Sequence, residues 1–254
     1  PGFAPTVEGW ISALAVQRDG GILIGGDMQS VNGEPRRYLA RLHADGTLDP
    51  DFNPGLLLET PSACVYDLKV QPDGKIVAAG FFRVGDRYPY VVRLNPDGSL
   101  DSSFQADTSD WHWWCGATTL ALLPDGKMYV SGGQIARLNA DGSLDPTFNA
   151  DPRAEWISYG ACIKTITVQS DGKVVIGGAF DHVQTYSANC LARLNPDGSV
   201  DSSFYPAPEL PRFMIINAVE PTPAGEMLMG STLRHDTDAA NCLRLLSPGG
   251  WALS

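Results

Sequence analysis

Five short segments, each five to seven residues after a phenylalanine, carry an acidic side chain that could do chemistry. These acids are Glu8, Glu59, Asp110, Glu155 and Glu209. If the segments lie on one side of the fold, the five carboxylates would surround one opening and could hold a hard cation such as calcium. The alternative is that they are ordinary solvated acids, because loops are polar and lie on the surface.

Aromatic side chains lie close to these acids in the sequence. They are Trp10, Trp111, Trp113, Trp114, Trp156 and Phe213. An aromatic ring can stack on the apolar face of a sugar while a neighbouring carboxylate accepts hydrogen bonds from its hydroxyl groups. The alternative is that the rings pack between structural units, since tryptophan is usually largely buried. Three near neighbours on one strand cannot all be buried on one face, so we expect Trp113 or Trp114 to be exposed.

Catalytic chemistry is less well supported by the residue pattern. Glycoside hydrolysis needs two carboxyl groups about 5 to 10 Å apart, but the acids are spread evenly and no pair is distinguished. The four histidines show no spacing typical of a metal site or a Ser/His/Asp triad. No Gly-rich loop suited to phosphates is present. We therefore assign no catalytic residues, and a sugar-cleaving enzyme is the third-ranked hypothesis.

The acids and aromatic residues lie between copies of a repeat. An apolar run ending in Asp-Gly is followed in each copy by a second apolar run that ends in glycine. The Asp-Gly pairs begin at Asp19, Asp73, Asp125 and Asp171, and the fifth copy has decayed to Ala224-Gly225. Five copies of about 51 residues account for the chain. Short glycine-punctuated copies without helical periodicity predict the blades of a β-propeller.

The second copy shows the strands expected in one blade. They are Val65–Gln71, Lys75–Phe82, Tyr90–Asn95 and Ser99–Phe104. Pro-Asp-Gly connects the last two strands, since proline presets the first turn position and glycine accepts the left-handed one.

The Pro-Asp-Gly turn fixes a register that places Arg93 opposite Asp101. The same spacing predicts three further ion pairs, Arg41 with Asp49, Arg137 with Asp145, and Arg193 with Asp201. Opposite charges facing each other across antiparallel strands are stabilising, so we expect a structural role for these residues. In the fifth copy Arg244 is expected to face Ala252, which removes the pair.

The two ends of the chain complement each other. The last copy stops before its phenylalanine, while the chain begins Pro1-Gly2-Phe3. Phe3 would therefore supply the missing outer piece of the last blade, and this interlock would remove open sheet edges. The prediction is an all-β, five-bladed β-propeller formed by a single domain, residues 1–254. Its blades are expected at residues 10–52, 63–104, 115–148, 161–204, and 214–254 plus 1–5.

Two modules carry a resemblance to a known family. They are Leu-Ala-Arg-Leu-Asn-x-Asp-Gly-Ser-Leu-Asp-x-x-Phe and Val-Gln-x-Asp-Gly-Lys-x-x-x-x-Gly-Gly, and they resemble the bacterial delta-60 repeat family. The resemblance extends over residues 11–250 and is weak only in the fifth copy. It implies β-propeller modules of large, often secreted or surface proteins, and it implies no reaction and no catalytic residues.

Composition limits the partners. The formal net charge of −11 would repel nucleic acid and anionic lipid. No apolar run approaches the roughly 18 residues needed to cross a bilayer. We therefore expect neither nucleic-acid binding nor membrane insertion.

The five cysteines occupy repeat-equivalent positions: Cys64, Cys115 and Cys162 on first strands, and Cys190 and Cys242 near third strands. Equivalent sites on adjacent blades are usually further apart than the Cα separation of about 7 Å that a disulfide allows. Buried free thiols are therefore expected.

The third copy is shortened between its second and third strands. Only four positions separate Gly133 from Arg137, against 15 between Gly26 and Arg41. The resulting notch either admits a partner or is a neutral deletion.

These observations favour a secreted or surface-exposed propeller that binds a ligand rather than transforming it. Carbohydrate is the first ligand hypothesis, through the aromatic and acidic residues of one face. The second is a protein-interaction or accessory subunit that docks in a larger assembly, which a large apolar surface patch would favour.

Overall fold

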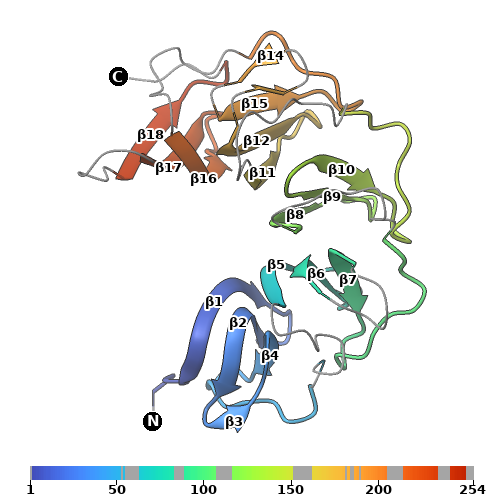
Figure 1. The fold of residues 1–254 in the computed structure, drawn as a ribbon, viewed down its shortest axis with the longest axis vertical. Coiled ribbons are helices and arrows are strands. Elements are labelled where there is room, and N and C mark those ends of the chain that lie inside the picture. Colours follow the sequence, from blue (N-terminus) through green and yellow to red (C-terminus); the bar gives the residue numbers. More distant parts are fainter. Residues whose placement is uncertain are drawn as a thin grey trace. The chain divides into compact units, whose positions relative to one another are not determined.

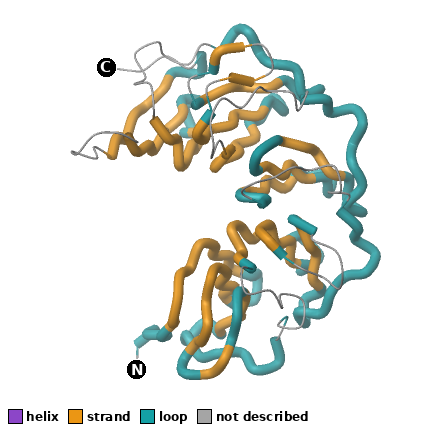
Figure 2. Tube along the Cα trace, in the orientation of Figure 1, coloured by secondary structure: helices purple, strands orange, loops and turns teal. Residues whose placement is uncertain are grey.

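The computed structural model describes residues 2–52, 54, 63–82, 89–106, 116–150, 162–180, 182–183, 186–188, 190–204, 214–233 and 241–249. Every regular element in these residues is a β-strand (Figure 1 and Figure 2). The predicted all-β class is confirmed.

Within the described residues the strands form five sheets of three or four strands and one two-stranded ribbon. The first sheet contains β1 (Val7–Val16), β2 (Ile22–Val31), β3 (Glu34–Pro35) and β4 (Leu39–Leu42). The second contains β5 (Cys64–Val70), β6 (Ile76–Phe81) and β7 (Val91–Leu94), and the third β8 (Thr119–Leu122), β9 (Met128–Ser131) and β10 (Ile135–Leu138). The fourth contains β11 (Cys162–Val168), β12 (Val174–Ala179) and β15 (Leu191–Leu194), and the ribbon β13 (His182–Val183) and β14 (Tyr186–Ser187). The fifth contains β16 (Met214–Pro221), β17 (Met227–Leu233) and β18 (Asn241–Leu246).

Each sheet follows the same order, with the second strand of the copy between the first and the third. The expected fourth strand at Ser99–Phe104 is wrong: only one isolated bridge, between Leu94 and Leu100, remains of it. The chain turns immediately afterwards, because the Asp101 carboxylate accepts hydrogen bonds from the backbone N–H and the hydroxyl of Ser103. The N–H of Phe104 then donates to the carbonyl oxygen of Asp101.

The predicted turn and its register are confirmed. Gly98 adopts a φ of 91°, which glycine tolerates and other residues rarely do. Its N–H donates to the carbonyl of Asn95 at 2.9 Å, and the N–H of Asn95 donates to the carbonyl of Ser99 at 2.8 Å. The N–H of Asp101 donates to the carbonyl of Arg93 at 2.9 Å, which places these two residues opposite each other.

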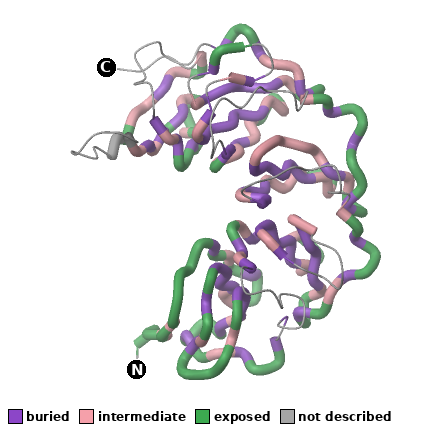
Figure 3. The backbone as a smooth tube through the Cα atoms, viewed as in Figure 1, coloured by how far each residue is buried: buried purple, intermediate pink, exposed green. Residues whose placement is uncertain are grey.

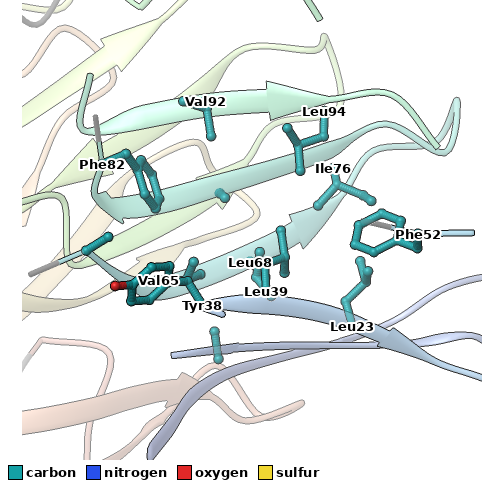
Figure 4. Packing of buried hydrophobic residues seen from close by; sticks show 13 residues of the cluster. Leu23, Tyr38, Leu39, Phe52, Val65, Leu68, Ile76, Phe82, Val92 and Leu94 are labelled. Carbon is teal, nitrogen blue, oxygen red and sulfur yellow. The ribbon is translucent and has the colours of Figure 1, made fainter. Parts of the chain in front are cut away.

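The described chain divides into two compact units, one built mainly from the first two sheets and the other mainly from the fourth and fifth. In the first unit, apolar side chains of neighbouring sheets form one core (Figure 4). It includes Leu23 and Leu39 of the first sheet and Val65, Leu68 and Ile76 of the second. In the second unit the equivalent core lies between the fourth and fifth sheets.

Arg93 shows how successive copies are joined. Its Nε donates to the Asp101 carboxylate at 2.7 Å, and its guanidinium lies 4.8 Å from the centre of the Phe104 ring. Its Nη1 donates to the carbonyl oxygen of Ala140, in the turn of the next copy, at 2.6 Å. One side chain therefore fixes its own turn and reaches the following copy.

The same arrangement recurs in three further copies. Arg41, Arg137 and Arg193 pair with Asp49, Asp145 and Asp201, and they donate to the carbonyl oxygens of Pro96, Pro196 and Pro248. Their guanidinium groups lie over Phe52, Phe148 and Phe204. The four ion pairs predicted from the sequence are confirmed, whereas the hydrogen bond to the next copy was not foreseen.

In the fifth copy, the strand register shows that Arg244 was wrongly aligned with the arginines of the other copies. Arg193 pairs with Val175 across its sheet, but the residue equivalent to Val175 in the fifth sheet, Leu228, pairs with Leu245 rather than with Arg244. Leu245 therefore takes the place of the arginine. The alignment by residue type was wrong because the turn containing Pro248, and not the arginine, sets the register.

Lowering the pH should weaken the ion pairs between arginine and aspartate. The Lys75 ammonium and the Ser103 hydroxyl hold the pKa of Asp101 below its ordinary value. A lowered folded-state pKa gives stability that is present above the unfolded pKa of about 4 and is lost as the pH falls through the folded pKa. We expect the free energy of unfolding, measured by urea titration, to fall steadily below pH 4. Asp101→Asn should be less stable at pH 7 and should lose less on acidification; an identical pH dependence in the variant would contradict this.

Candidate functional site

A β-bulge interrupts the first strand of four sheets at the same repeat position. The register skips Ser12 in β1, Tyr66 in β5, Lys164 in β11 and Asn217 in β16. All four side chains are exposed, although their chain neighbours Ile11, Val65, Ile163 and Ile216 are apolar. Bulges redirect a side chain and often lie next to functional sites. The side chains of these four residues differ in chemistry from copy to copy, whereas the turn and core positions of the repeat carry similar residues in each copy.

The bulge explains the glycine that ends the second apolar run. A Cβ atom on Gly26, Gly80 or Gly178 would lie 2.0, 2.0 and 2.1 Å from the carbonyl oxygens of Trp10, Cys64 and Cys162. At these three positions the backbone opposite the bulge approaches too closely for a side chain, whereas Ser231 takes the equivalent position in the fifth sheet. Glycine recurring at one position in a strand is the sequence signal that could have located the bulges.

Trp10 and Asp27 form a cross-strand pair beside the bulge of β1. Trp10 is 79% exposed, although it lies on the same face as Ala13, which is buried against the second sheet. The ring therefore extends past the end of the core between the sheets instead of packing within it. Glu8 is also exposed and accepts a hydrogen bond from the Ser30 hydroxyl at 2.8 Å.

Cys64 and Tyr66 of the second sheet lie near this pair. Burial raises the pKa of the Cys64 thiol, and the charge of Asp27 adds to that rise against a hydrogen bond with Ser12. Burial also raises the pKa of Tyr66, with further contributions from Cys64 and Asp27. The phenol and the thiol are therefore neutral at physiological pH. Together Trp10, Ser12, Asp27, Cys64 and Tyr66 form what we call the Trp10 cluster.

Of the predicted acid–aromatic pairs, the described residues contain Glu8 with Trp10, and Trp10 belongs to the Trp10 cluster. The other predicted site residues lie outside the described residues: Glu59, Asp110, Trp111, Trp113, Trp114, Glu155, Trp156, Glu209 and Phe213. Sequence reasoning missed Ser12, Asp27 and Tyr66, because their proximity depends on the bulge and on the packing of two sheets.

In the part of the chain that the structure describes, no three His, Cys, Asp or Glu side chains are grouped so that they could hold a metal ion. Nor does that part contain a helix that could span a membrane.

The cysteines only partly follow the expectation of free thiols. Cys64 and Cys190 form no disulfide and are half-buried. Cys162 is disulfide-bonded, so the expectation was wrong for this residue. The distance argument assumed that Cys162 could reach only its repeat equivalents on evenly spaced blades, and the disulfide shows that this assumption fails here.

The short connection in the third sheet is confirmed. β9 ends at Ser131 and β10 begins at Ile135, and the N–H of Gly132 donates to the carbonyl of Gln134 at 2.9 Å.

The repeated sheets agree with a sequence comparison. Residues 17–52, 71–104, 123–148 and 169–204, together just over half of the chain, match the family described as a domain of unknown function (DUF5122) beta-propeller. The chain belongs to this family. The DUF5122 segments coincide with the four well-preserved copies, and the fifth copy lies outside them. No curated protein matches the chain.

Solved structures show the same fold. A protein of unknown function from Bacteroides caccae has a TM-score of 0.54 at 14% identity, over 96% of this chain and 81% of that one. A catalytically inactive virginiamycin B lyase from Staphylococcus aureus has a TM-score of 0.55 at 13% identity, over 94% and 73%. The extracellular domain of a hybrid two-component system from B. thetaiotaomicron has a TM-score of 0.51 at 13% identity, over 92% and 30%. At these identities the similarity concerns the fold alone.

Proposed function

We propose that this DUF5122 propeller is a binding protein without catalytic activity and that its ligand is a carbohydrate. The observation that carries the proposal is the exposure of Trp10 next to two carboxylates, those of Glu8 and Asp27. An exposed indole ring offers a sugar an apolar stacking surface, and the carboxylates accept hydrogen bonds from its hydroxyl groups.

The bulge residues support binding over catalysis. Ser12, Tyr66, Lys164 and Asn217 provide donors and acceptors of four kinds, and no two of them form a paired acid and base. The other acid–aromatic pairs of the sequence would add equivalent contacts from other copies, and calcium held by the five acids would add a cation to the same surface.

The binding surface needs the sheets to be arranged as blades, and we propose one closed five-bladed ring of the delta-60 type. The N-terminal segment supports closure. A Cβ atom on Gly46 would meet Phe3 and Pro5, just as one on Gly142 would meet Gln105 and Ala106. Phe3 and Pro5 therefore lie against the first copy as the end of a preceding blade does, which is the place expected if Phe3 completes the last blade.

We propose an extracellular or cell-surface location. The disulfide at Cys162 supports it, because disulfides persist in oxidising compartments. One similar structure, that from B. thetaiotaomicron, is the extracellular domain of a hybrid two-component system.

A glycan-array screen tests the binding proposal. We expect the unmodified protein to bind a restricted class of glycans and Trp10→Ala to lose at least about tenfold in affinity, since one stacked ring contributes on the order of 1.4 kcal/mol. Tyr186→Ala is the matched control, because Tyr186 is an exposed ring, 47% accessible, on the separate β13–β14 ribbon. Running the array with calcium and with EDTA separates a calcium-dependent site from a metal-free one. Equal signals for Trp10→Ala and the unmodified protein would overturn the site.

A further inference from the structure

The Trp10 cluster lies beside negative charge that no basic side chain of the described residues neutralises. Asp27 is the cross-strand partner of Trp10, and Glu8 lies two residues before the ring on β1. Both acidic side chains are exposed, as is most of β1 in Figure 3. In the part of the chain that the structure describes, neither carboxylate forms an ion pair with a lysine or an arginine.

Other acids of the described sheets have a cation beside them. Asp67 of β5 lies 2.8 Å from the Lys69 ammonium group. The four repeat carboxylates lie 2.7 or 2.8 Å from an arginine Nε, and they are Asp49, Asp101, Asp145 and Asp201. These acids are therefore neutralised within their own copy, whereas the described residues provide no such partner for Asp27.

The combination of an aromatic ring and an acid is specific to the first sheet among the sheets whose equivalent positions are described. The equivalent cross-strand pairs of the second, fourth and fifth sheets carry no charge, and they are Cys64 with Phe81, Cys162 with Ala179, and Ile215 with Thr232. Residues that the blade requires recur from copy to copy. A ring and a charge present in one copy alone therefore serve something other than the fold.

The charge of Asp27 also acts on the second sheet. Burial is the main cause of the raised pKa of Tyr66, with further contributions from Cys64 and Asp27. The phenol therefore keeps its proton and can donate it in a hydrogen bond to a sugar oxygen. The Tyr66 ring is 37% exposed and adds apolar surface to that of Trp10.

A sugar that carries a positive charge would satisfy all of these groups. The face of an indole ring attracts cations as well as apolar surface. A uronic acid or a sulfated sugar would bring negative charge against Asp27, and a neutral sugar would leave that carboxylate without a counter-charge. Cβ atoms of a cross-strand pair are about 5 Å apart, a spacing that one hexose can cover with its ring on Trp10 and an amino group at Asp27.

We propose that the Trp10 cluster selects amino sugars that carry a free, protonated amine, such as the glucosamine units of a deacetylated glycan. The inference rests on the carbohydrate-binding function proposed above and names its class of sugar. Glu8, whose carboxylate accepts a hydrogen bond from the Ser30 hydroxyl at 2.8 Å, supplies a second negative charge near the ring. Acetylation of the amine removes its positive charge and should weaken binding.

Calorimetric titration with two matched oligosaccharides tests the proposal. One is a chain of glucosamine, and the other is the same chain with every amine acetylated. At about pH 6 the amines are protonated and the carboxylates are ionised. We expect the glucosamine chain to bind at least about fivefold more tightly, the factor that one opposite charge about 4 Å away provides in water. Asp27→Asn should remove most of this preference, because it keeps the shape of the side chain and removes its charge.

Two controls separate the site from general charge attraction. Asp171→Asn makes the same change to the net charge of −11 at an exposed acid in a turn of the fourth copy, and it should keep the preference. A lysine oligomer with as many charges as the glucosamine chain should bind more weakly than that chain, since it has no sugar ring to stack on Trp10.

The outcomes distinguish this inference from the function on which it rests. Equal affinities for the two chains, or tighter binding of the acetylated one, with binding still lost in Trp10→Ala, would overturn the inference and leave carbohydrate binding standing. A preference that Asp27→Asn retains, or that Asp171→Asn loses equally, would overturn it in favour of overall charge. A lysine oligomer that binds as tightly would overturn it in favour of a basic peptide. No binding of any glycan would overturn the proposed function itself.

Discussion

Arg41→Ala should lower the free energy of unfolding by about 3 kcal/mol, because it removes the cation that neutralises a largely buried carboxylate. Asp49 has a side chain only 9% exposed, and Arg41 Nε lies 2.7 Å from it. The substitution also removes the hydrogen bond to the Pro96 carbonyl and the contact with the Phe52 ring. Urea unfolding followed by circular dichroism measures the loss as a lower midpoint at unchanged slope.

Arg244→Ala is the matched control for this prediction. Arg244 is the fifth-copy arginine in the sequence, but the register places Leu245 at the structural position of Arg41. Its replacement should cost less than about 0.5 kcal/mol, as for most surface positions. If Arg244→Ala were as costly as Arg41→Ala, the register that pairs Leu245 with Leu228 would be contradicted.

Gly80→Ala should destabilise the protein by about 3 kcal/mol, the upper part of the range for added atoms in a packed site. The new methyl group would lie 2.0 Å from the carbonyl oxygen of Cys64 and 2.8 Å from the ring of Phe82. The bulge in β5 would have to open, or β6 would have to move away from it.

Gly230→Ala is a control at a strand glycine without the clash, one repeat position earlier, where the second copy has Ala79. No atom lies within 4 Å of a Cβ on Gly230, and its backbone requires no positive φ. Alanine there should be neutral or stabilising by up to about 1 kcal/mol, because it reduces the entropy of the unfolded chain. Thermal melts of the two variants compare them directly, and equal losses would show that glycine is required for a reason other than the bulge.

Much of each copy could be predicted from sequence because its interactions are local. The Asp-Gly turns are short-range signals, and counting outward from a turn of known length gives the register that pairs Arg93 with Asp101. What was missed depends on contacts between copies. The bond from Arg93 to the Ala140 carbonyl joins residues 47 positions apart, and no local pattern marks a backbone acceptor.

The candidate site was harder to predict for the same reason. Glu8 and Trp10 stood out because an acid with a nearby aromatic residue recurs in the segments between the copies. Asp27 and Tyr66 were missed because the register of the first sheet pairs Asp27 with Trp10, and a bulge in the second sheet exposes Tyr66, which strand alternation alone does not foresee. The recurring glycine was visible in the sequence, but its cause is a backbone approach that only the paired strands reveal.

The central claim is that the Trp10 cluster binds carbohydrate, and glycan-array binding of the unmodified protein and of Trp10→Ala tests it most directly. We expect selective binding by the unmodified protein that is lost in Trp10→Ala and retained in Tyr186→Ala. No binding to any glycan by the unmodified protein, or binding that survives in Trp10→Ala, would contradict the claim.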